Sequence, residues 1–177
     1  MSATTLSRLD RQLQDLSPDS TRYQVLMAVR KFRSNWVELG RLLSDVAYGG
    51  DYKEWGYDDF EVYCAKELGL KKPTVHKLMV SYNYMKTYAP ERLKAPDAER
   101  GYDVPDYQTV ELLNQARQSD RLDDSAKDDL HRRAFAPWED GASDAEPMDE
   151  VALRKEIRDR TRADPAAIAA ANDRRGH

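Results

Sequence analysis

The side chains best suited to binding chemistry in this chain are cations gathered in one stretch. Residues 71–94 carry six Lys or Arg against one Glu, whereas residues 118–150 carry eleven Asp or Glu against four Lys or Arg. Ammonium and guanidinium groups neutralise the phosphates of nucleic acids and pair with the carboxylates of acidic proteins. The whole chain has a net charge of −4, which argues against indiscriminate nucleic-acid binding. The positive stretch is therefore the candidate binding surface.

No arrangement of residues in the sequence points to catalysis, a cofactor or a metal site. Cys64 is the single cysteine, so a disulfide framework and a zinc site built on several thiolates of one chain are excluded. It lies in an apolar position, where we expect it to be inert packing. His76, His131 and His177 are too scattered to form a metal site, and no glycine-rich phosphate loop is present. We therefore do not expect an enzyme.

Residues 61–78, which read EVYCAKELGLKKPTVHKL, have the spacing of two helices joined by a tight turn. Gly69 suits a turn that leaves right-handed helical geometry. Ala65, four residues earlier, is expected where the two helices cross at close range. The apolar positions that would clamp the second helix onto the first are Cys64, Leu68, Leu70, Val75 and Leu78.

This spacing resembles the helix-turn-helix superfamily of DNA-binding proteins, over residues 61–80 only. In that superfamily the second, recognition helix lies in the major groove with its N-terminal residues at the base edges. The resemblance implies a recognition helix over residues 73–88, in which helical geometry also places Tyr84 outward. Carried over position by position, the base-facing residues are Lys72, Pro73, His76, Lys77 and Val80, to which helical geometry adds Tyr84. The residues expected to neutralise phosphates are Lys71, Lys86, Arg92 and Lys94.

The sequence departs from the family at the first exposed positions of this helix. They contain no Asn, Gln or Arg, which are the usual bidentate readers of adenine and guanine. Lysine can donate to guanine N7 or O6, and an exposed Val80 could meet a thymine methyl group. Recognition would then depend on Lys, His and the shape of the DNA.

The residues before the motif carry helical periodicity. Leucines recur at spacings of three and four over residues 1–16, which predicts a short amphipathic helix. After a Ser-Pro-Asp start signal at residues 17–19, one apolar stripe runs from Tyr23 to Val46 and ends at Gly49-Gly50. We interpret this stretch as one long scaffold helix against which the motif packs.

The later helices have their own start and stop signals. Asp58, with Glu61 three residues on, has the spacing of a capping box. Pro73 begins the second helix of the motif, and Ala89-Pro90 stop it. In the C-terminal region, Asp106 can cap one helix and either Asp123 or Asp124 can cap another.

Taken together, these patterns predict an all-α protein, because the sequence shows no strand-like alternation. No apolar run approaches the length of a membrane span, and we expect a cytoplasmic, nucleoid-associated protein. The expected organisation is an amphipathic helix over 1–16, a helix-turn-helix domain over 17–95, a linker over 96–106, a helical region over 107–162 with a loop at 136–148, and a flexible tail over 163–177.

Three functional hypotheses follow. The first is a homodimer that binds double-stranded DNA as a transcriptional regulator or a chromosome- or plasmid-associated protein, with a protein partner possible through the C-terminal helices. The second is an adaptor module that docks Val80, Tyr84 and the neighbouring lysines on an acidic protein. The third joins them: the acidic segment 118–150 folds over the basic helix and restrains DNA binding.

Overall fold

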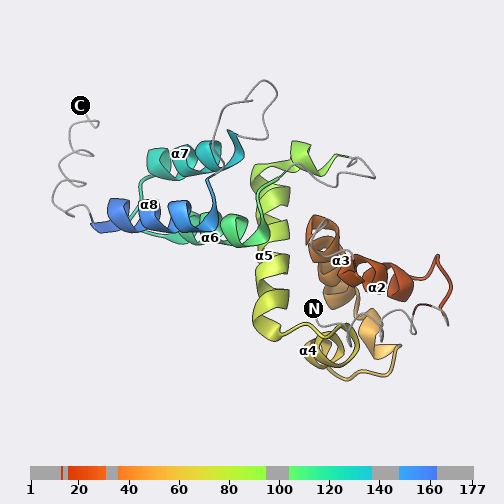
Figure 1. Cartoon of the computed structure of the whole chain (residues 1–177). Coiled ribbons are helices and arrows are strands. Elements are labelled where there is room, and N and C mark those ends of the chain that lie inside the picture. Colours follow the sequence, from red (N-terminus) through yellow and green to blue (C-terminus); the bar gives the residue numbers. More distant parts are fainter. Residues whose placement is uncertain (1–12, 14–15, 31–35, 95–103, 137–147, 163–177) are drawn as a thin grey trace. The chain divides into compact units, whose positions relative to one another are not determined.

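The computed structural model describes residues 13, 16–30, 36–94, 104–136 and 148–162 (Figure 1). All the regular secondary structure in these residues is helical, which confirms the expected all-α class. None of the described helices is long and apolar enough to cross a membrane. The chain divides into two compact units, 1–103 and 104–177, which are described separately. Most of the expected N-terminal helix, linker, acidic loop and tail lies outside the described residues.

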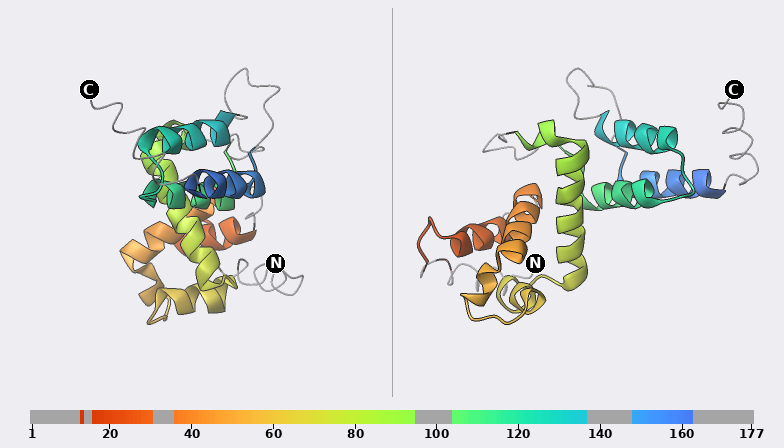
Figure 2. Two further views of the ribbon diagram at one scale, coloured as in Figure 1. Left: turned by 90° about the vertical axis from the view of Figure 1, so that its left-hand side faces the viewer. Right: turned by 180° about the vertical axis from the view of Figure 1, so that it is seen from behind.

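The expected long scaffold helix is two helices. Helix α2 (Thr21–Arg30) and helix α3 (Trp36–Gly49) pack against each other, as the two views of Figure 2 show. The prediction of one helix was wrong because an apolar stripe needs a partner to cover it. Two shorter helices that fold back on each other bury their own stripes. The side chains buried in this way include Val25, Leu26, Val29, Leu39, Leu43 and Val46.

The first helix of the motif is short and irregular. Helix α4 (Phe60–Tyr63) begins at an N-cap on Asp59, whose side chain accepts from Val62 N at 3.0 Å, and not on Asp58 as the sequence suggested. It continues as wider π-helical turns over Cys64–Leu68. Gly69 ends this segment with φ 69°, a left-handed conformation that glycine adopts without steric cost. The five apolar clamp positions are all buried, as expected.

Helix α5 (Lys72–Tyr88) is the second helix of the motif and packs chiefly on α3. The two helices cross at Gly40 of α3, where an added Cβ would lie 2.8 Å from Leu78 O and 2.9 Å from Tyr82 Cβ. Ala65 is exposed, so the expectation that it marks the close helix crossing was wrong. The long-range contact with α3, which the motif pattern does not include, determines where the small residue is needed.

The second unit is formed by α6 (Tyr107–Gln118), α7 (Asp124–Phe135) and α8 (Glu150–Arg162), with α6 packed against both α7 and α8. Asp106 caps α6 by accepting from two backbone N–H groups, and Asp123 caps α7, both as expected. The buried side chains between these helices include Val110, Leu113, Leu130, Ala134 and Leu153.

Candidate nucleic-acid interface

The first turn of α5 is the most open part of the motif. Lys71, Lys72, Pro73 and His76 are all exposed. No acidic residue occurs anywhere in α5, and no side chain caps its N-terminus. The N-terminal end of a helix carries a partial positive charge and backbone N–H groups without intrahelical partners. The first turn therefore combines two cationic side chains with a positive helix end.

The opposite side of α5 is held by the protein interior. Val75, Leu78 and Met85 are buried, whereas Lys77 and Val80 are partly exposed. Packing on this side fixes which side chains of the first turn face away from the core. One face of the helix thus packs on the interior and the other is open to solvent, as the motif pattern predicted for its first turns.

Tyr84 does not belong to the exposed surface. It is 2% exposed, and its ring lies beside that of Tyr88, tilted by 41°, with a centroid separation of 4.7 Å. The expected outward position was wrong. It assumed that only the face of α5 that meets the rest of the motif would be buried. The C-terminal half of α5 is buried over a wider arc, which also includes Ser81 and Met85.

The expected phosphate-binding cations do not form one patch. Helix α5 has 17 residues and at 1.5 Å per residue extends about 26 Å. Lys71 lies at its N-terminal end, whereas Arg92 and Lys94 follow its C-terminal end in and after the 3₁₀ turn Pro90–Leu93. Lys86 is exposed near that end, with Nζ 5.8 Å from the centre of the Tyr82 ring. Only Lys71 accompanies the base-facing candidates Lys72, Pro73 and His76.

An ion pair joins the two helices of the motif at the exposed end of α5. The ammonium of Lys72 lies 2.7 Å from Oε1 of Glu61, and the two side chains are 71% and 48% exposed. The hydrogen bond to Glu61 raises the pKa of Lys72. The pair borders a hollow of about 160 Å³ that Phe60, Val75, His76 and Met79 also line. The sequence pattern assigned Glu61 only to helix capping and did not identify it as a functional residue.

The motif is anchored to α2 by a second carboxylate. Arg22 donates from Nε and Nη2 to the two oxygens of Glu67, both at 2.7 Å, and the Tyr57 hydroxyl donates to Glu67 Oε2 at 2.8 Å. The Glu67 side chain is fully buried. The hydrogen bond from Arg22 to this carboxylate raises the Arg22 pKa. Three segments that are distant in sequence are thereby fixed behind the turn that positions α5.

Cys64 lies in the same interior. It is fully buried, and burial raises the pKa of its thiol to about 12. Because the thiolate is the reactive form, the folded protein keeps this side chain inert. Its observed role is packing behind the motif, as its apolar position in the sequence indicated.

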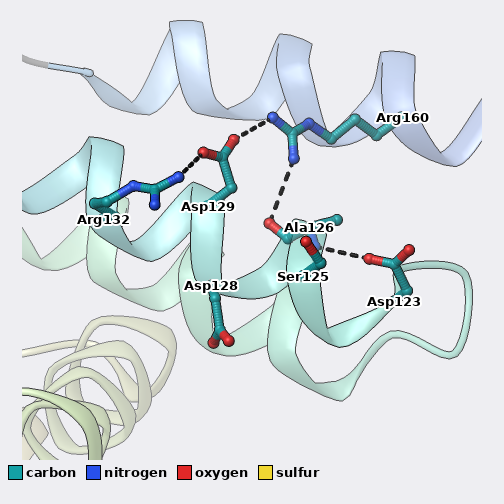
Figure 3. Close-up of a pocket in the computed structure, with 7 residues that line it drawn as sticks. All are labelled: Asp123, Ser125, Ala126, Asp128, Asp129, Arg132 and Arg160. Atoms are coloured by element: carbon teal, nitrogen blue, oxygen red, sulfur yellow. Dashed lines mark hydrogen bonds and ion pairs between the residues drawn. The ribbon is translucent and has the colours of Figure 1, made fainter.

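Several carboxylates in the described part of the acidic segment are engaged in ion pairs. Arg160 Nη2 lies 2.6 Å from Asp129 Oδ2, and Arg132 pairs with the same carboxylate at 2.5 Å (Figure 3). Arg117 pairs with Asp128 at 2.7 Å. Hydrogen bonds from Arg160 and Arg132 lower the pKa of Asp129. A hollow of about 660 Å³ is bordered by Asp128, Asp129, Arg132 and Arg160. Within the described part of the chain no cluster of His, Cys, Asp and Glu has the composition of a metal site.

Comparison with known proteins does not identify a relative of this chain. No protein-family model, curated protein or solved structure matches the chain significantly.

Proposed function

We propose that this protein binds double-stranded DNA through the first turn of α5, as a transcriptional regulator or a chromosome- or plasmid-associated protein. The observation that carries the proposal is the exposed, cationic start of a helix that is hinged at Gly69 and packed against the interior on its other side. A helix held in this way can enter the major groove with its N-terminal residues first.

Charge supports the same conclusion. Lys71 and Lys72 lie on an exposed helix start that has no acidic residue in its own helix. Counterions released from DNA phosphates favour contacts with such cations, and each contact increases the salt dependence of binding. Because a single turn offers few contacts, we expect a homodimer that places two copies of α5 on one duplex.

The adaptor hypothesis loses its aromatic anchor. It relied on an exposed Tyr84 beside Val80, but Tyr84 is buried. Aromatic side chains supply much of the binding energy in protein interfaces. The remaining exposed surface at the start of α5 is polar and cationic, so it offers an acidic protein charge contacts but no exposed Tyr84 to anchor it.

The test is a fluorescence anisotropy titration with mixed genomic duplexes, repeated over a series of salt concentrations. The wild type should bind at low salt and weaken steeply as salt increases. A Lys72→Glu/Lys77→Glu variant should lose at least about tenfold in affinity, because two favourable charges become repulsive. A Lys155→Glu/Arg158→Glu variant changes the net charge equally on exposed positions of α8 and should bind like the wild type.

Two outcomes would contradict the proposal. One is the absence of binding by the wild type at low salt. The other is an equal loss in both double variants, which would indicate that only the total charge of the chain matters. Analytical ultracentrifugation with and without duplex tests the expected dimer.

A further inference from the structure

The geometry points to a composite base reader at the start of α5: we infer that Glu61 and Lys72 together recognise a G·C base pair. This inference rests on the proposed DNA binding and names the sequence feature that the site would select. It adds a carboxylate acceptor from the preceding helix to a recognition helix that has no acidic residue of its own. The starting observation is the 2.7 Å contact between Lys72 Nζ and Glu61 Oε1.

The distance between the two charged groups matches the distance between two groups on the major-groove edge of a base pair. In a G·C pair the guanine O6 acceptor and the cytosine N4 donor are hydrogen-bonded to each other, so they lie about 3 Å apart in the major groove. An ammonium and a carboxylate in contact present a donor and an acceptor at a similar spacing. Lys72 can therefore donate to guanine O6 while Glu61 accepts from cytosine N4.

The order of groups across the groove favours G·C over A·T. Guanine presents two adjacent acceptors, N7 and O6, which a lysine can share, and cytosine N4 follows as the donor for Glu61. An A·T pair presents its single donor, adenine N6, between two acceptors, adenine N7 and thymine O4. A carboxylate that accepts from adenine N6 would lie next to the lone pairs of both acceptors, adenine N7 and thymine O4. The repulsion makes A·T the poorer partner.

The same pair disfavours binding that depends on phosphate alone. A phosphate satisfies Lys72 but repels Glu61, whereas a G·C edge gives both side chains a partner. Both side chains are exposed enough to reach a duplex, at 71% and 48%, and they flank an open hollow and not the packed interior. Glu61 should therefore lower the affinity for arbitrary DNA while raising the preference for the correct base pair.

The experiment begins with selection of bound duplexes from a random pool by the wild-type protein. The selected sequences should contain one G·C pair that cannot be exchanged freely. Replacing that pair by A·T in the best duplex should weaken wild-type binding about tenfold, as expected for loss of a specific base contact. Affinities for the G·C and A·T duplexes are then measured by anisotropy for each variant, and circular dichroism checks that the variants are folded.

The variants separate base reading from charge. Glu61→Ala should reduce the tenfold ratio to less than about twofold and bind arbitrary duplex more tightly than the wild type. Glu61→Gln should move the preference toward A·T, because an amide pairs with adenine N6 and N7. The matched control is Lys71→Met, which removes a cation next to Lys72 and should weaken both duplexes by the same factor.

An unchanged G·C to A·T ratio in Glu61→Ala would overturn the inference. This holds also when both duplexes gain affinity equally, because Glu61 would then act only as a negative charge near the DNA. Both results leave DNA binding itself intact. Failure of the wild type to bind any duplex at low salt is a different outcome, which would overturn the proposed function as well.

Discussion

The start of α5 and the α7–α8 face of the second unit both carry charged side chains, but these side chains are arranged in different ways. In α5, Lys72 and Lys86 are exposed on a helix without acidic residues, and Lys72 is held by a carboxylate that is itself half exposed. In α7 and α8 the arginines at 132, 133 and 160 converge on Asp129 and Glu156. The local charge counted from sequence therefore does not measure the charge that a partner meets.

The comparison bears on the hypothesis that the acidic segment covers the basic helix. Part of that segment's charge is neutralised within its own unit by arginines of α8, as Figure 3 shows for Arg160. A carboxylate that is already paired has less to gain from a lysine elsewhere. The described part of the second unit thus lends no support to a DNA-mimicking role.

The largest effect is expected where α3 and α5 touch. Gly40→Val should lower the free energy of unfolding by about 3 kcal/mol, since a Cβ at this position meets the backbone carbonyl of Leu78. The backbone cannot yield as a flexible side chain would. Ala47→Val is the matched control on the same helix, because Ala47 is partly exposed, and it should cost less than about 1 kcal/mol.

Cys64 provides a measurement of this effect that is specific to the first unit. It is the sole cysteine and is fully buried, so thiol-labelling reagents reach it only when this unit opens. Labelling should be much faster in Gly40→Val than in Ala47→Val at equal pH. Equal labelling rates would show that the close approach at Gly40 is not required, and that α5 can shift without loss of stability.

A smaller effect is expected at the carboxylate behind the motif. Glu67→Ala should cost about 2 kcal/mol, less than a fully buried ion pair, because the partly exposed Arg22 can be rehydrated. The matched control is Glu38→Ala, which breaks a partly exposed two-bond pair with Arg41 on α3. That loss should be below about 1 kcal/mol. Urea unfolding followed by circular dichroism compares the two, and equal losses would show that burial of Glu67 has no energetic consequence.

The parts of this site that the sequence predicted are those with local causes. Gly69 was recognisable because a helix-ending turn needs its left-handed conformation, and the end of α5 was recognisable from Ala89-Pro90. Apolar spacing identified the five clamp positions because a helix repeats its inward face every three or four residues. Each of these signals lies within a few residues of the feature that it predicts.

The parts that the sequence did not predict depend on partners distant in the chain. Gly40 meets Leu78, and Arg22 meets Glu67 across 45 residues, and no periodicity records such pairs. The division of the scaffold into α2 and α3 was missed because one continuous apolar stripe is compatible with one helix or two. Ser34-Asn35, residue types preferred at helix N-caps, do precede Trp36 in the sequence, and they are the signal that favours two.

The smallest effect is expected at Asp129 in the second unit. Its pairs with Arg160 and Arg132 are near the surface, so Asp129→Asn should cost less than about 1 kcal/mol at neutral pH. Because these arginines lower the pKa of the folded Asp129, its contribution is present above the unfolded pKa of about 3.9. That contribution disappears as the pH falls through the lowered, folded pKa.

The difference in the free energy of unfolding between wild type and Asp129→Asn should therefore shrink toward zero as the pH falls from about 5 to about 2. Urea unfolding at several pH values measures it, and 1 M salt at neutral pH should shrink it too, because exposed pairs are screened. Labelling of Cys64 at neutral pH should be as slow in this variant as in the wild type, since Asp129 lies outside the first unit. A difference that persisted at low pH would mean that Asp129 acts through its shape and not its charge, and the contrast between the paired charges of this unit and the exposed cations of α5 would then fail.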